Sequence, residues 1–85
     1  MGLTQADLIK LFKEEIAQEL SITVDEISVH ETFLSIGLDS ITAIFLLERL
    51  EKKLQIELNP IWFWDYPTIN SFTQFLTSEL SRKIK

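Results

Sequence analysis

The chain has 85 residues, a mass of 9.9 kDa and a formal net charge of -5 at pH 7. This length suits one small domain, so residues 1–85 are predicted to form a single unit. The acidic balance argues against nucleic acid and anionic membrane surfaces as partners, because both require a basic surface. Cysteine is absent, so disulfides, thiolate metal sites and thiol nucleophiles are excluded. Small secreted domains usually carry disulfides, and no signal peptide is visible, so we expect a cytoplasmic protein without membrane insertion.

The first predicted helix runs from Thr4 to Leu20. Thr4 is a good capping residue, and Asp7 follows three positions later as its acidic capping partner. Apolar residues then recur every fourth position, at Leu8, Phe12, Ile16 and Leu20. This spacing is typical of one apolar face of an amphipathic helix. The charged residues are assigned to the opposite, solvated side: Lys10, Lys13, Glu14, Glu15 and Glu19.

The segment 21–37 is interpreted as a long ordered loop. Its apolar residues alternate as in a hairpin, but Asp25-Glu26 is a poor two-residue hairpin turn. We expect one capped turn from Thr23 to Glu26, and a left-handed or tight turn at Gly37. The apolar residues expected to pin this loop to the core are Ile22, Val24, Ile27, Val29, Phe33 and Leu34.

The second predicted helix runs from Ser40 to Leu54, with Asp39 as its N-cap. At about 100° per residue, a core-facing stripe is formed by Ala43, Leu46, Leu47, Leu50 and Leu54. Ile41, Ile44 and Phe45 fall on a different side, spread around Glu48. A helix that is apolar on two sides contacts a loop, a bound group or another protein. One alternative is therefore that the long loop covers these residues.

Two proline breaks organise the rest of the chain. Asn59-Pro60 precedes a short helical turn predicted from Ile61 to Asp65, and Tyr66-Pro67 follows it. Thr68 then caps a helix predicted from Ile69 to Arg82. The sequence thus predicts an all-α bundle with three main helices, one short helix and a long first loop.

The residues provide little for catalysis or metal binding. The single histidine, His30, lies in the long loop without an evident nucleophile and orienting acid. The acidic residues do not follow a metal-ligand spacing, and two glycines cannot build a phosphate-binding loop. No catalytic residue and no metal site are therefore predicted. Ser40 lies at a helix N-terminus, which favours an attached phosphate, although a serine there is more often only part of the cap.

The charge pattern around Ser40 is one-sided. From Glu14 to Glu48 every charged residue is acidic. Such a stretch steers a basic protein partner toward Ser40, although the same charges also serve solubility.

Two motifs resemble those of acyl carrier protein domains of the polyketide synthase type. The segment Gly37-Leu38-Asp39-Ser40-Ile41, followed by Thr42-Ala43, is similar to the family's attachment motif. The segment Trp64-Asp65-Tyr66-Pro67-Thr68 is similar to a second motif of these domains. The resemblance extends from about Leu8 to Leu80. It implies that Ser40 carries 4′-phosphopantetheine, transferred from coenzyme A by a phosphopantetheinyl transferase, and that its thiol holds an acyl chain as a thioester.

The resemblance also implies a non-catalytic, monomeric carrier that works with polyketide or specialised fatty-acid synthase enzymes. The helix after Ser40 would be its partner-recognition helix, with a surface formed by Ile41, Ile44, Phe45 and Glu48. Phe45 replaces a common acid and Leu47 replaces a frequent arginine, which substitutes apolar contact for charge. The alternatives are a peptidyl carrier protein and an unmodified helical interaction module. The Met1 start favours a discrete protein over an excised domain, and the carried acyl group is not specified.

Overall fold

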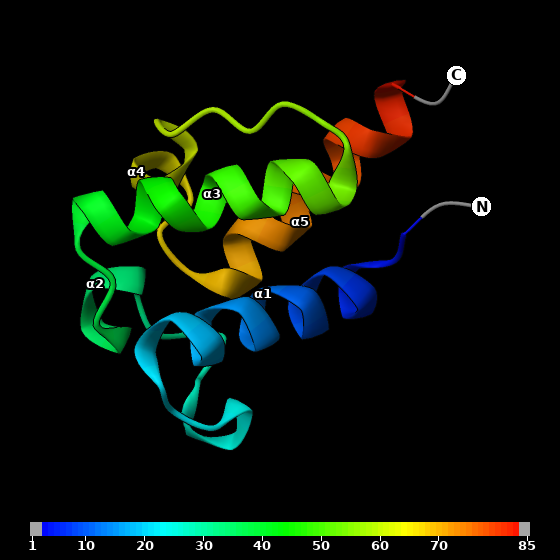
Figure 1. Ribbon diagram of the computed structural model, residues 1–85. Helices are drawn as coiled ribbons and strands as arrows, with labels where there is room; N and C mark the ends of the chain where they lie inside the picture. The colour runs from blue at the N-terminus through cyan, green and yellow to red at the C-terminus, as the bar shows by residue number, and fades with distance from the viewer. Residues whose placement is uncertain (1–2, 84–85) are drawn as a thin grey trace.

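A computed structural model describes residues 3–83 of the chain. The elements follow in the order α1 (Gln5–Leu20), η1 (Val24–Glu26), α2 (Phe33–Ile36), α3 (Ser40–Leu54), α4 (Trp62–Asp65) and α5 (Ile69–Lys83). Helix α1 contacts both α3 and α5, and α1 and α3 run in opposite directions (Figure 1). The predicted all-α bundle with three main helices is confirmed. No helix within the described residues is long and apolar enough to cross a membrane.

Side-chain caps fix the starts of the three main helices close to the predicted positions. The Asp7 backbone N–H donates to Thr4 Oγ1 at 3.2 Å, and the Thr4 N–H donates to Asp7 Oδ2 at 3.0 Å. The Asp39 carboxylate caps α3 by accepting from the Thr42 N–H, and Thr68 Oγ1 accepts from Ser71 N–H at 3.0 Å at the start of α5. These bonds satisfy backbone donors that have no partner inside the helix.

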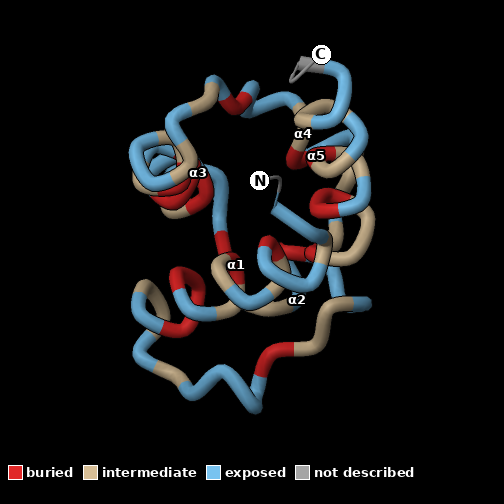
Figure 2. Tube along the Cα trace, turned by 90° about the vertical axis from the view of Figure 1, so that its right-hand side faces the viewer, coloured by how far each residue is buried: buried red, intermediate tan, exposed pale blue. Residues whose placement is uncertain are grey.

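The core lies where α1, α3 and α5 face one another, and the buried positions of the chain are the red stretches in Figure 2. On α3, the predicted stripe is buried at Ala43, Leu46, Leu47 and Leu50 and half-buried at Leu54. Aromatic rings join the long loop and α4 to α5. The Phe33 and Phe63 ring centres are 4.6 Å apart, and those of Phe33 and Phe72 are 5.9 Å apart.

The long loop differs in part from the prediction. The capped turn after Thr23 is present as η1, but residues 33–36 form the helical turn α2, which the sequence did not indicate. Ile27 and Phe33 are buried as expected. Val24 and Leu34 are exposed, so the prediction that they pin the loop is wrong. The helical turn explains Leu34, because it directs the neighbouring Phe33 into the core and Leu34 outward.

Backbone hydrogen bonds attach this loop to the segment between α4 and α5. The Phe33 N–H donates to the Pro67 carbonyl at 2.8 Å, and the Asn70 N–H donates to the Val29 carbonyl at 3.0 Å. Glu51 of α3 fixes the loop after α3 in a similar way, because its Oε2 accepts from Leu58 N–H at 2.7 Å. Together these bonds set the positions of α2 and α4 relative to the start of α3.

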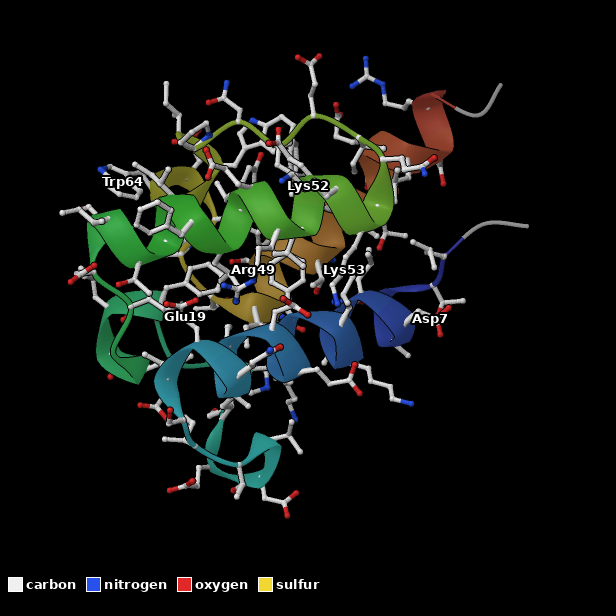
Figure 3. The ribbon with its side chains drawn as sticks, in the orientation of Figure 1. Asp7, Glu19, Arg49, Lys52, Lys53 and Trp64 are labelled. Carbon is white, nitrogen blue, oxygen red and sulfur yellow. The ribbon has the colours of Figure 1, made fainter. Side chains whose placement is uncertain are left out.

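Glu15 was predicted to lie on the solvated side of α1, and this prediction is wrong because Glu15 is buried. Its side chain is only 4% exposed and faces α3. Arg49 Nε donates to Glu15 Oε1 at 3.0 Å, and Lys53 Nζ lies 2.8 Å from Glu15 Oε2. Arg49 Nη1 also donates to Glu19 Oε1 at 2.6 Å, so two acids and two cations join the helices (Figure 3). Glu15 is buried because these cations replace the water that a carboxylate otherwise needs.

Candidate functional site

The approach to Ser40 is shaped by the turn at Gly37. Gly37 has a φ of 123°, and its N–H donates to the carbonyls of Phe33 and Leu34 at the end of α2. The next N–H, of Leu38, donates to the Phe33 carbonyl at 2.9 Å, and the Leu38 side chain is buried. The turn therefore anchors the chain immediately before Asp39 and Ser40.

Asp39 and Ser40 begin α3 at the protein surface. The Asp39 carboxylate accepts from the Thr42 backbone N–H at 2.8 Å. This hydrogen bond lowers the pKa of Asp39 below its ordinary value of 3.8, because the backbone N–H stabilises the charged carboxylate. Ser40 is exposed beside this cap. Its side chain is accessible to an enzyme, while the cap fixes the backbone that presents it.

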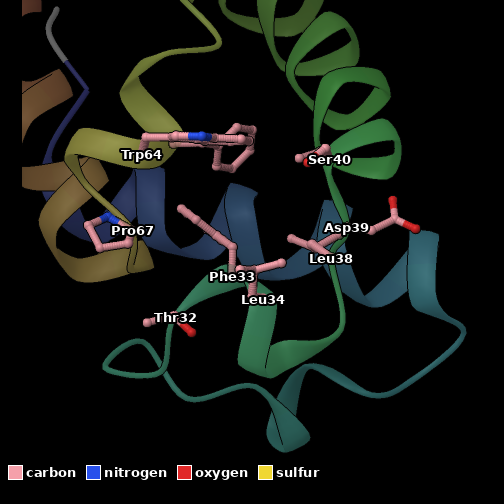
Figure 4. Close-up of a pocket in the computed structure, with 10 residues that line it drawn as sticks. Thr32, Phe33, Leu34, Leu38, Asp39, Ser40, Trp64 and Pro67 are labelled. Atoms are coloured by element: carbon pink, nitrogen blue, oxygen red, sulfur yellow. The ribbon is translucent and has the colours of Figure 1, made fainter.

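A cavity of about 340 Å³ opens next to Ser40 (Figure 4). Its lining comes from α2, the start of α3, α4 and the connection before α5: Thr32, Phe33, Leu34, Leu38, Asp39, Ser40, Ala43, Phe63, Trp64 and Pro67. Phe33 and Phe63 are each 4% exposed, whereas Leu34 is 75% and Trp64 65% exposed. The cavity thus has a buried aromatic floor and an exposed apolar rim.

The predicted partner surface on α3 is exposed. The exposed fractions are 67% for Ile41, 44% for Ile44 and 54% for Phe45, and Glu48 is exposed beside them. The alternative in which the long loop covers these residues is wrong, because η1 packs against α1 instead. An apolar surface therefore continues directly from Ser40 along α3.

Charges on α3 are separated from this apolar surface. Residues 41–47 carry no charged side chain. Arg49 and Lys53 are paired with Glu15 and Glu19 of α1, so both cations belong to the α1 side of the helix. The first two turns after Ser40 consequently offer apolar contacts, with the acidic Asp39 and Glu48 at their edges.

Sequence reasoning identified Asp39 and Ser40 but missed the cavity beside them. Trp64 was noted only as part of a motif, yet it lines the cavity opposite Ser40. Its only sequence signal was an aromatic residue just before the second proline break, which does not reveal exposure. His30 is exposed in the loop, and among the described residues no group of three or more His, Cys, Asp or Glu is placed to hold a metal ion.

Comparison with known proteins assigns the family. Residues 10–76 match the family model described as "Phosphopantetheine attachment site". A free-standing peptidyl carrier protein of Acinetobacter baumannii is 37% identical, with a TM-score of 0.83 over 89% of this chain and 95% of that chain. An acyl carrier protein of Anabaena sp. PCC 7120 with a variant phosphopantetheinylation-site sequence is 34% identical, with a TM-score of 0.85 over 94% of this chain and 91% of that chain.

Larger proteins match as well. A polyketide synthase of Bacillus subtilis is 35% identical over 80% of this chain and 2% of its own length. The chain spans 1% to 4% of the length of the curated relatives it matches. The family model, the identities and the fold therefore agree with the motifs around Ser40. This chain belongs to the phosphopantetheine-attachment family and is a non-catalytic carrier domain for covalently bound 4′-phosphopantetheine.

Proposed function

We propose that Ser40 is the attachment residue and that the domain carries acyl intermediates as thioesters on the phosphopantetheine arm. The observation that carries this proposal is the exposed Ser40 at the capped start of α3, inside the Gly37–Ile41 motif. In the transfer, Ser40 Oγ forms a bond to the phosphate that bears pantetheine. The pyrophosphate bond of coenzyme A breaks, adenosine 3′,5′-bisphosphate leaves, and the serine proton passes to a base of the transferase.

Intact mass spectrometry tests the attachment residue. The protein is incubated with coenzyme A and a broad-specificity phosphopantetheinyl transferase. We expect the mass to increase by one phosphopantetheine in the wild type and in Ser35→Ala, and to stay unchanged in Ser40→Ala. Ser35 is a matched control because it is an exposed serine of the same region. An unmodified wild type would instead support a helical interaction module, and a modified Ser40→Ala would place the arm elsewhere.

The partners follow from the surface around Ser40. We propose that the transferase and the synthase enzymes bind the face formed by Ile41, Ile44, Phe45 and Glu48, because these exposed residues follow Ser40 on α3. The face has an apolar centre and acidic edges at Asp39 and Glu48. A complementary partner has an apolar contact area bordered by basic side chains.

The pathway we propose is polyketide or specialised fatty-acid biosynthesis. The match to a polyketide synthase supports it, as does the Trp64–Thr68 motif. A peptidyl carrier is the second candidate, because the structure that is 37% identical is a peptidyl carrier protein. Loading assays separate the two: acyl transfer from acyl- or malonyl-loaded partners supports the first, and transfer of an aminoacyl group from an adenylating enzyme supports the second.

We further propose that residues 1–85 act as one monomeric domain in the cytoplasm.

A further inference from the structure

We propose that Glu19 of α1 is a specificity-determining residue, which holds Arg49 away from the partner surface of α3 and so keeps this surface open to basic enzymes. The inference rests on the proposed function, in which enzymes reach Ser40 across this surface. Figure 3 shows Arg49 between α3 and α1, beside Glu19. A residue on a different helix thereby controls the charge at the edge of the partner surface.

Arg49 is a neighbour of the partner surface on α3. It follows Phe45 by four residues, so the two side chains lie on consecutive turns of the same side. Side chains of an α-helix tilt toward its N-terminus, so an unrestrained Arg49 extends toward Phe45 and Ser40. Arg49 is also the cation of α3 nearest to Ser40 in the sequence, because Lys52 and Lys53 lie about one turn further on. Its direction therefore decides whether a positive charge borders the surface.

Two acids of α1 hold the guanidinium of Arg49. Nη1 donates to Glu19 Oε1 at 2.6 Å, and Nε donates to Glu15 Oε1 at 3.0 Å. Both hydrogen bonds raise the pKa of Arg49, that with Glu19 the most, because each stabilises the charged guanidinium. The Arg49 side chain is nevertheless 39% exposed, so it has room to turn when one acid is removed.

Glu19 is the acid whose loss frees Arg49. Glu15 has a second cation, since Lys53 Nζ lies 2.8 Å from its Oε2, and it therefore stays paired when Arg49 turns away. Within residues 3–83, Glu19 pairs with Arg49 alone. The Glu19 side chain is 25% exposed, so an uncharged glutamine in its place keeps contact with water and the fold is retained.

A freed Arg49 would change the partner surface in two ways. Its positive charge would lie near the acidic edge at Glu48 and would repel the basic side chains of a partner. Its long side chain would also pack on Phe45, which is 54% exposed, because guanidinium groups favour aromatic faces. The surface would lose negative potential and apolar area together. By preventing this, Glu19 favours partners whose apolar contact area has a basic border.

The kinetics of phosphopantetheine transfer to Ser40 provide the first test. With coenzyme A and a broad-specificity transferase at about 50 mM NaCl, we expect Glu19→Gln to lower kcat/KM by about twofold to fivefold, the effect of one exposed charge pair. The loss should appear in KM, with kcat unchanged, because the docking step is affected. Glu14→Gln is the matched control, since it removes one negative charge from an exposed position of the same helix, and it should match wild type.

Ionic strength distinguishes docking from a change of fold. The difference between Glu19→Gln and wild type should shrink at about 1 M NaCl, where charges interact over only about 3 Å. A difference that keeps its full size in high salt would overturn the inference, because the substitution would then act through structure. Equal values of kcat/KM for Glu19→Gln and Glu14→Gln in low salt would overturn it as well.

The second test asks whether Glu19 acts through Arg49. We expect Glu19→Gln to have no effect on kcat/KM in an Arg49→Gln background. The double variant keeps the wild-type net charge of -5, because one acid and one base are removed together. An equal decrease in both backgrounds would overturn the inference, since Glu19 would then act by its own charge. Circular dichroism verifies that each variant is folded before the rates are compared.

The outcomes separate this inference from the proposed function. If Ser40 of the wild type gains no phosphopantetheine, the proposed function fails. If Ser40 is modified and all variants react at the rate of the wild type, only the assignment of Glu19 fails. A decrease confined to Glu19→Gln, sensitive to salt and abolished by Arg49→Gln, is the result that supports it.

Discussion

At the scale of single residues, Gly37 determines how the chain enters α3. Its φ of 123° is a backbone conformation that side chains with a Cβ adopt at a cost. A Cβ at this position would lie 3.6 Å from Leu20 Cδ1, an ordinary contact, so the requirement for glycine is conformational. Gly37→Ala should lower the free energy of unfolding by about 1–2 kcal/mol.

Chemical denaturation checks this prediction. Ser35→Ala, an exposed change on α2, is the control and should stay within about 0.5 kcal/mol of wild type. A Gly37→Ala protein as stable as the control would mean that the turn relaxes without cost.

The prediction of a special turn at Gly37, like the Asp39 cap, depended only on local backbone geometry. Trp64 could not be predicted in this way, because its place opposite Ser40 depends on how α4 lies against α3.

At the scale of elements, α3 shows why some of the structure follows from periodicity. Its bounds and its buried stripe agree with the prediction because fifteen residues give the apolar period several turns in which to repeat. Helix α2 has only four residues and no period to detect. It is held by long-range hydrogen bonds, including the one from Phe33 N–H to the Pro67 carbonyl. A local sequence pattern cannot predict such bonds.

The two faces of α3 predict opposite responses to substitution. Leu50 is fully buried, so Leu50→Ala should cost about 2–5 kcal/mol in unfolding experiments. Phe45 is 54% exposed, so Phe45→Glu should change stability by only about 0.5 kcal/mol. The same substitution should change the rate at which a transferase modifies Ser40, because it adds charge to the apolar face. A large loss of stability in Phe45→Glu would assign Phe45 to the core, and unchanged rates with several transferases would remove it from the partner surface.

At the scale of the whole molecule, the buried carboxylate of Glu15 connects α1 to α3. Its cation partners, Arg49 and Lys53, belong to α3, and both are partly exposed. The sequence could not indicate this contact, because Glu15 lies within a run of charged residues that equally suits a solvated face. The orientation of α3 against α1 decides which acid is buried, and that orientation also directs Phe45 and Ile41 outward.

Glu15 makes the stability of the whole domain depend on pH. Burial raises the pKa of Glu15, but hydrogen bonds from Lys53 and Arg49 outweigh it and hold the pKa below its ordinary value of 4.5. The unfolded chain therefore binds a proton at a higher pH than the folded domain does. The stabilising contribution of Glu15 is complete above about pH 4.5 and is lost as the pH falls through the lower folded-state pKa.

The substitution Glu15→Gln measures how much the ionised Glu15 carboxylate contributes to the free energy of unfolding. At pH 7 it should lower the free energy of unfolding by about 1–3 kcal/mol, because charge-assisted hydrogen bonds are lost while Arg49 and Lys53 still reach water. Below pH 4.5 the variant and wild type should converge. Glu14→Gln, an exposed neighbouring change, should stay within about 0.5 kcal/mol of wild type at pH 7. Denaturation curves at several pH values measure all three proteins, and a constant difference between Glu15→Gln and wild type down to pH 3 would show that Glu15 does not titrate with folding.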